Sequence, residues 1–204
     1  KAGGDTAARR DDGYAIRNLG PYTALAYDWL HDQMSPALRE KARARWKAWL
    51  DWYREHGYRA HDPGSNYHAG YLLSATMIAI AEAGDADPAR WHEVADTMWG
   101  KEMALALADD GVLRGGDWPE GWQYGPLAVA EYSLAARVAR GAGIDVKGVS
   151  TWLSALLRRH VYGLSPADGV YAGGDTEDEL PNIKPAVLTL DAIALGDATP
   201  DDKR

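Results

Sequence analysis

The stretch HAGYLLSATMIAIAEA, residues 68–83, decides the fold class of this chain. From Tyr71 to Ala81 it carries no charged side chain, so a helix over these residues has no strongly polar face. Such a helix is buried in the centre of a protein, and the run is too short to cross a bilayer. The sequence therefore predicts a central buried helix and no membrane partner.

Similar segments alternate with longer amphipathic ones along the chain. Further helices that are poor in charge are expected at residues 21–31, 125–140 and 185–195. Amphipathic helices are expected from Ser35-Pro36 to near Gly57, from Asp87-Pro88 to about Asp109, and over residues 146–162. No segment shows the sustained period of two that is typical of strands. The chain is predicted to be all-α.

The starts of the buried helices form a repeat. Four short segments align: Asn18-Leu19-Gly20-Pro21, His68-Ala69-Gly70-Tyr71, Gln123-Tyr124-Gly125-Pro126 and Asn182-Ile183-Lys184-Pro185. A turn rich in glycine and polar residues precedes each: Gly3-Gly4-Asp5, Pro63-Gly64-Ser65-Asn66, Gly115-Gly116-Asp117 and Gly173-Gly174-Asp175. A period of about 50 to 60 residues with two helices per unit indicates stacked helical hairpins.

Stacked hairpins form either an open solenoid or a curled α/α toroid. A solenoid needs a polar end cap, and residues 191–204 are too short and irregular to serve as one. We therefore expect residues 1–204 to form a single, incomplete α/α toroid domain. The glycine-containing turns would then lie at one mouth of the ring, where a cleft can form.

Composition excludes several classes of function. The 204 residues carry a net charge of -8, which argues against a nucleic-acid partner. The absence of cysteine excludes disulfides, thiolate metal sites and a cysteine nucleophile. Aromatic residues are 9 Trp and 11 Tyr with no Phe, a bias that suits sugar platforms as well as a protein core. Residue 1 is Lys, and we expect the chain to be a piece of a longer protein.

Two loops carry the candidate chemistry. Residues 61–68 hold two of the six histidines and Asn66 at a helix start, where backbone N–H groups favour anions. Residues 114–124 hold two tryptophans, two carboxylates and Tyr124. By the repeat alignment, His68 and Tyr124 begin adjacent inner helices, so they are expected to face one another. Two interpretations stay open for each residue. His68 is a catalytic group or a histidine that caps its helix, and Tyr124 is a catalytic group or a tyrosine of the core.

Three segments, in this order, resemble a known family. Residues 24–30 read ALAYDWL and precede Leu38-Arg39, Asn66 stands two residues before His68, and residues 119–125 read PEGWQYG. Over residues 14–178 they resemble the helical hairpin, the Asn/His loop and the tyrosine motif of heparinase II/III-like and related alginate lyases. That family cleaves uronic-acid polysaccharides by β-elimination.

The resemblance implies catalytic roles. Tyr124 corresponds to the catalytic tyrosine, His68 to the toroid histidine and Asn66 to the residue that neutralises the substrate carboxylate. Tyr67 separates Asn66 from His68, which are often adjacent in the family. A further histidine usually comes from a following β-sheet portion, so we expect a β-sheet domain of the same full-length chain as a partner. A polysaccharide substrate implies a periplasmic or extracellular location.

The elimination needs no metal and no cofactor. A free tyrosine has a pKa of about 10, so Tyr124 needs a neighbouring cation such as His68 or Arg114 to act as a base. The polysaccharide or oligosaccharide substrate is expected to contact further side chains of the two loops: Trp118, Trp122, Glu120, Asp117, Arg114 and Tyr67.

Two other functions stay open at this point. A glycoside hydrolase on a similar toroid would use Asp117 or Glu120 together with an acid from the last turn, such as Asp175. A non-catalytic carbohydrate-binding toroid would use Trp118 and Trp122 as stacking platforms.

Overall fold

The computed structural model describes residues 4, 6–85, 88–116, 118–121, 123–146, 148–162 and 174, and over these ranges the protein is all-α. The longer helices are α1 (Ile16–Leu30), α2 (Pro36–His56), α3 (Asn66–Ala81), α6 (Gly125–Gly141) and α7 (Val149–Tyr162). Shorter helical segments are η1 (Ala7–Gly13), η2 (His31–Gln33), α4 (Ala89–His92), η3 (Glu93–Met103), α5 (Ala104–Ala106) and η4 (Arg114–Gly116). The only strand-like pairing in the described part is an isolated bridge between Gly121 and Gly174.

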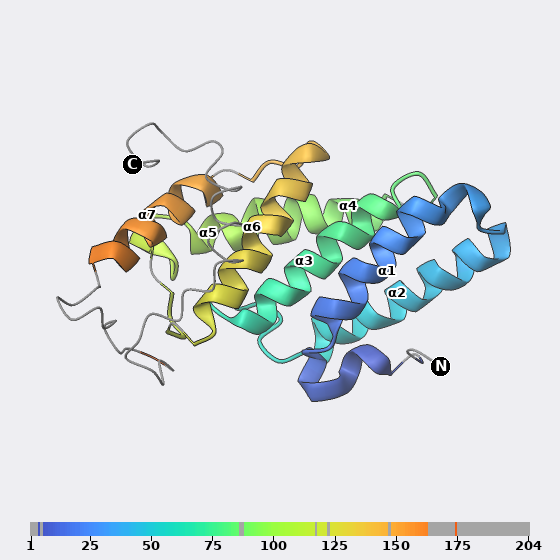
Figure 1. The fold of residues 1–204 in the computed structure, drawn as a ribbon, viewed down its shortest axis with the longest axis horizontal. Coiled ribbons are helices and arrows are strands. Elements are labelled where there is room, and N and C mark those ends of the chain that lie inside the picture. Colours follow the sequence, from blue (N-terminus) through green and yellow to red (C-terminus); the bar gives the residue numbers. More distant parts are fainter. Residues whose placement is uncertain are drawn as a thin grey trace.

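Helix α3 lies between α1 and α6, and these three helices run in the same direction (Figure 1). Helix α2 returns antiparallel to α1, and the path α4–η3–α5 connects the end of α3 back toward the start of α6 (Figure 1). The starts of α1, α3 and α6 therefore share one edge of the molecule. The predicted alternation of a central helix with a returning helix is present for these three units.

The polar–apolar pattern of α2 explains its bounds and its buried face. Ser35 caps the helix by accepting a hydrogen bond from the Leu38 N–H at 3.3 Å, and Pro36 occupies the first helical position. The helix ends at Gly57. The side chains spaced three and four residues apart on one face are buried: Trp46, Trp49, Leu50 and Tyr53.

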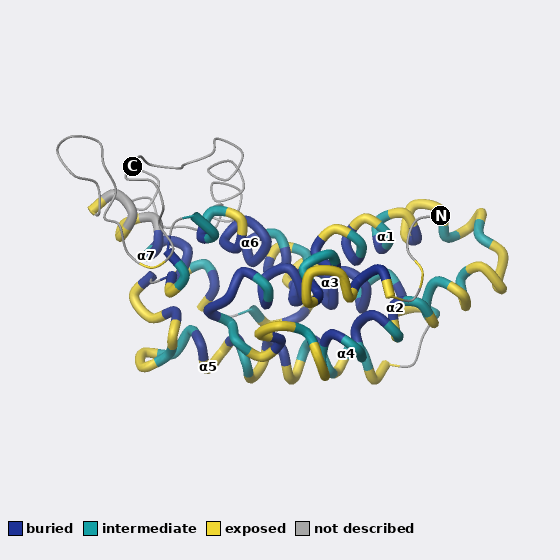
Figure 2. The backbone as a smooth tube through the Cα atoms, turned by 90° about the horizontal axis from the view of Figure 1, so that it is seen from below, coloured by how far each residue is buried: buried dark blue, intermediate teal, exposed yellow. Residues whose placement is uncertain are grey.

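Helix α3 is the centre of the core, as its composition predicts. Every residue from His68 to Ala79 is buried, and the tube of α3 is dark along most of its length (Figure 2). The aligned glycines of the repeat allow close helix contact. A Cβ at Gly20 would collide with the Cβ of Ser74, and one at Gly70 would lie 2.6 Å from the Cβ of Arg17.

One helix boundary and one helix type differ from the predictions. Helix α1 begins at Ile16 rather than Pro21, so that Pro21 lies inside the helix, a position where proline removes a backbone hydrogen bond and which sequence rules therefore assign to a helix start. The expected helix that ends near Asp109 contains an eleven-residue π-helical segment, η3, which periodicity of 3.6 does not reveal. The expected helix at residues 185–195 lies outside the described residues, as does the fourth repeat start at residues 182–185. None of the described helices combines the length and hydropathy needed to cross a membrane.

Candidate polar site at the starts of α3 and α6

The loops that precede α3 and α6 meet at the shared helix-start edge. Gly64 lies against Pro119, where an added Cβ would be 3.1 Å from the proline Cγ. The hydroxyl of Tyr132, on α6, donates to the Pro63 carbonyl at 2.6 Å. The bridge to Gly121 also brings Gly174, from the last glycine-containing turn, to this place. Turns that are far apart in the sequence thus meet at one place, where Ser65, Asn66 and Trp118 are buried.

Asn66 begins α3 and binds a carboxylate. Its backbone N–H and its side-chain Nδ2 donate to the same Glu120 oxygen, at 2.8 and 3.0 Å. Ser65 caps the helix by accepting from the Tyr67 N–H at 3.2 Å. The positive end of the helix dipole adds to the attraction for a negative group here. Both loops singled out from the sequence therefore contribute to one anion-binding arrangement.

Behind Asn66 lies a buried charged pair that the sequence analysis missed. Arg17 of α1 donates to the Asn66 carbonyl and, at 3.2 Å, to its Oδ1. The Arg17 Nε lies 3.3 Å from Glu131 Oε1, and its guanidinium sits 3.7 Å from the centre of the Tyr14 ring. Burial raises the pKa of the Glu131 carboxyl to about 7, and the Arg17 charge only partly offsets this effect. Glu131 is the only acidic residue in α6, and this was the available sequence signal.

His68 is fully buried and contacts a different tyrosine from the expected one. Its Nδ1 lies 2.8 Å from the hydroxyl of Tyr132. Because that hydroxyl donates its only proton to the Pro63 carbonyl, Nδ1 carries the hydrogen and donates to Tyr132. Burial lowers the pKa of His68 and raises that of Tyr132 well above its ordinary value. The imidazole therefore holds the loop before α3 against α6 from the inside.

Glu102 of η3 makes a hydrogen bond with His61 and lies near His68. Its Oε1 lies 2.9 Å from Nδ1 of the exposed His61, and its Oε2 lies 3.8 Å from Nε2 of His68. Partial burial acts to raise the pKa of Glu102, but the interactions with His68 and His61 outweigh it and hold the pKa below its ordinary range. The π-helical segment is thus tied to the loop of residues 61–68.

Tyr124 is half-buried and directly precedes α6. Within the described ranges, no hydrogen bond or ring contact joins its side chain to His68. The repeat alignment places both residues at neighbouring helix starts, and that placement agrees with Figure 1. The side chains of His68 and Tyr124 nevertheless do not meet. The tyrosine that contacts His68 is the buried Tyr132, which lies two turns further along α6 than Tyr124.

The other candidate residues have different environments. Trp118 is buried and packs edge-on against Tyr132, with ring centres 6.1 Å apart. The half-buried Tyr67 meets the Tyr14 ring edge-on at 5.1 Å. Arg114 is exposed in η4. Three candidates lie outside the described residues: Asp117, Trp122 and Asp175.

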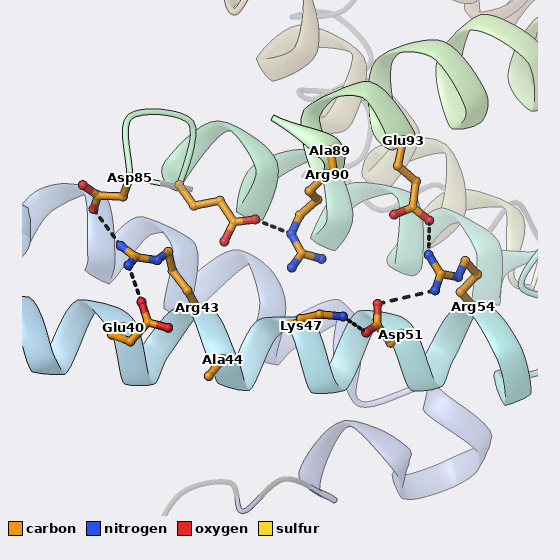
Figure 3. A pocket seen from close by; sticks show the side chains of 11 residues that line it. Glu40, Arg43, Ala44, Lys47, Asp51, Arg54, Asp85, Ala89, Arg90 and Glu93 are labelled. Carbon is orange, nitrogen blue, oxygen red and sulfur yellow. Dashed lines mark hydrogen bonds and ion pairs between the residues drawn. The ribbon is translucent and has the colours of Figure 1, made fainter. Parts of the chain in front are cut away.

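A separate groove of about 570 Å³ runs between α2 and the segment from the end of α3 to the start of η3 (Figure 3). Two ion pairs cross it: Arg43 lies 3.4 Å from Asp85, and Arg54 lies 2.9 Å from Glu93. These two pairs connect α2 to the next unit, while Arg90 contacts Glu82 within the opposite wall. None of the predicted site residues lines this groove.

Among the side chains that the structure describes, no group of three or more histidines and carboxylates is arranged to hold a metal ion. Comparison of the chain with models of protein families, with curated proteins and with solved structures finds no match. Fold and site define a protein of helical hairpins in which Asn66, at the start of α3, binds the carboxylate of Glu120 from the loop before α6.

Proposed function

We propose that this chain is the helical part of a polysaccharide lyase, an incomplete α/α toroid that cleaves a uronic-acid polymer by β-elimination. One observation carries the proposal: Asn66 directs two N–H donors at a single carboxylate oxygen, at the edge where Tyr124 begins α6. The parallel order of α1, α3 and α6 supports the toroid, because such a ring places its inner helix starts at one mouth.

The reaction explains why this arrangement is useful. Removal of the C5 proton of a uronate adds negative charge next to the sugar carboxylate, so donors that bind this carboxylate stabilise the transition state. Asn66 supplies two such donors. Tyr124 removes the proton or protonates the departing O4, and a neighbouring cation lowers its pKa for the first task. Arg114, exposed in η4, is the cation that this proposal assigns within the chain.

His68 has a supporting part in this scheme. Its side chain has no exposed surface, so its hydrogen bond with Tyr132 and its approach to Glu102 position the loop that carries Asn66. Direct contact with the substrate is assigned to the half-buried Tyr124 and to Asn66, which is 4% exposed and whose donors become free only when Glu120 moves aside.

The test uses the full-length protein and a set of uronic-acid polymers that includes alginate, heparan sulfate and polygalacturonate. We expect at least one polymer to yield unsaturated products that absorb in the ultraviolet. Tyr124→Phe is expected to lower the rate about 100-fold or more, the range usual for loss of an acid–base group. The control is Tyr162→Phe, at an exposed tyrosine of α7. An undiminished rate in Tyr124→Phe would overturn the assignment.

A second candidate is a glycoside hydrolase. The bridge between Gly121 and Gly174 favours it, because Glu120 and Asp175 are the sequence neighbours of the bridged residues. Hydrolysis would release reducing ends without ultraviolet absorbance, and Glu120→Gln would abolish it. The burial of Trp118 removes one of the two platforms on which a purely sugar-binding function depends.

A further inference from the structure

The orientation of the Asn66 amide is fixed from two sides. The Arg17 guanidinium donates to Oδ1 on one side, and the Glu120 carboxylate accepts from Nδ2 on the other. Turning the amide over would place its NH2 group against a donor and its oxygen against a carboxylate. Both contacts would then be repulsive, so only one orientation is stable.

Arg17 is itself held in place by its surroundings. Glu131 pairs with its Nε at 3.3 Å, the Tyr14 ring covers the guanidinium, and the Arg17 side chain is 4% exposed. Gly70 leaves the space through which this side chain passes. A planar guanidinium can contact Glu131 and both oxygens of Asn66 together, which a lysine ammonium cannot do with the same geometry.

We propose that Arg17 is a positioning residue that aims the two Asn66 donors, and that Glu120 occupies the place of the substrate carboxylate until a uronate displaces it. This inference rests on the proposed lyase function. The donors are directed at a carboxylate, and the carboxylate present is one of the chain's own side chains. Substrate binding then exchanges one carboxylate for another at a prepared pair of donors.

The two halves of the proposal predict different kinetic effects. Arg17→Lys keeps the positive charge but no longer fixes the orientation of the Asn66 amide. Because the substrate carboxylate is then held in the wrong position, kcat falls on the order of 10- to 100-fold. Glu120→Gln weakens the internal competitor, because a neutral acceptor binds N–H donors less strongly than a carboxylate does. KM should then fall by about five-fold. The matched control is Arg137→Lys, at an exposed position of α6.

A spectroscopic measurement tests the same geometry without catalysis. The side-chain NH2 signals of Asn66, identified by their absence in Asn66→Asp, are followed by nuclear magnetic resonance in the full-length protein. We expect them to shift in Arg17→Lys and in Glu120→Gln and to stay in place in Arg137→Lys. Unchanged amide signals and unchanged kcat in Arg17→Lys would overturn the positioning role. An unchanged or raised KM in Glu120→Gln would overturn the competitor role.

If Arg17→Lys does not fold, the double variant Asn66→Asp with Glu120→Gln carries the test. It reverses the polarity of the pair, because the introduced carboxylate accepts from Arg17 and the introduced amide donates to that carboxylate. We expect a folded protein that has lost turnover, and retained turnover would overturn the proposal. If the wild-type protein acts on none of the polymers, the lyase function fails, and the amide signals still decide the role of Arg17.

Discussion

Arg17 and Glu131 form an ion pair, with Nε and Oε1 3.3 Å apart, although they belong to helices α1 and α6 on opposite sides of α3. The pair is possible because α3 has a glycine, Gly70, where the arginine side chain passes. A buried charge pair thus connects three repeat units at the end of the molecule that carries Asn66. Its partners are 114 residues apart in the chain, from 17 to 131.

Gly70→Ala should destabilise the protein. The added Cβ would lie 2.6 Å from the Cβ of Arg17 and 2.8 Å from its Nε, so the arginine must move away from Glu131. We expect a loss of about 1–3 kcal/mol in the free energy of unfolding, the usual cost of overpacking. Urea denaturation measures it. Gly141→Ala, where nothing lies within 4 Å of the new Cβ, is the control and should be close to neutral. Equal stabilities of the two variants would contradict the crossing geometry.

Glu131 should make the protein less stable as the pH rises. Its pKa in the folded protein is about 7, above the usual value of 4.5, so the folded state binds more protons between these values. The stabilisation is full below about pH 4.5 and is lost as the pH rises through 7. Relative to wild type, Glu131→Gln should remove a pH-dependent change on the order of 3 kcal/mol in this window. Unfolding curves from pH 4 to pH 8 test this. Parallel pH profiles for the two proteins would count against the raised pKa.

Glu102→Gln should have the opposite pH signature. The pKa of Glu102 is held low, so the carboxylate stabilises the folded protein above its unfolded pKa, and this contribution is lost as the pH falls through the folded pKa. The variant should therefore be less stable than wild type near neutrality and should converge with it in acid. Thermal unfolding at several pH values provides the measurement. Glu55→Gln, at an exposed pair with His56, serves as control and should show no such convergence.

Tyr132→Phe should weaken the contact between α6 and the loop before α3. It removes the hydroxyl that donates to the Pro63 carbonyl and accepts from His68, and leaves the buried imidazole and the half-buried Pro63 without that partner. The expected cost is about 1–3 kcal/mol. Chemical denaturation measures it, with Tyr162→Phe at an exposed position as the comparison. Hydrogen exchange at residues 63–68 should also become faster, and unchanged exchange would exclude this anchoring role.

Local sequence patterns were sufficient to predict α2, α3, α6 and α7 to within a few residues. Ser35-Pro36 and Gly57 give the bounds of α2, and the uncharged run from Tyr71 to Ala81 identifies α3 as the buried helix. These features depend on neighbours within a few residues: a cap satisfies nearby N–H groups, and periodicity assigns a face. The repeat alignment also indicated which helix starts share an edge, because equivalent positions in stacked hairpins lie side by side.

Only the tertiary structure decided which side chains meet at that edge. Nothing local distinguishes Tyr132 from Tyr124 as the partner of His68, and nothing local pairs Arg17 with Glu131. Such choices depend on helix rotation and on the space that Gly70 leaves, which are set by the packing of segments distant in the chain. Trp118 is a core residue for the same reason, since its burial is determined by Tyr132 and Trp152 rather than by its own loop.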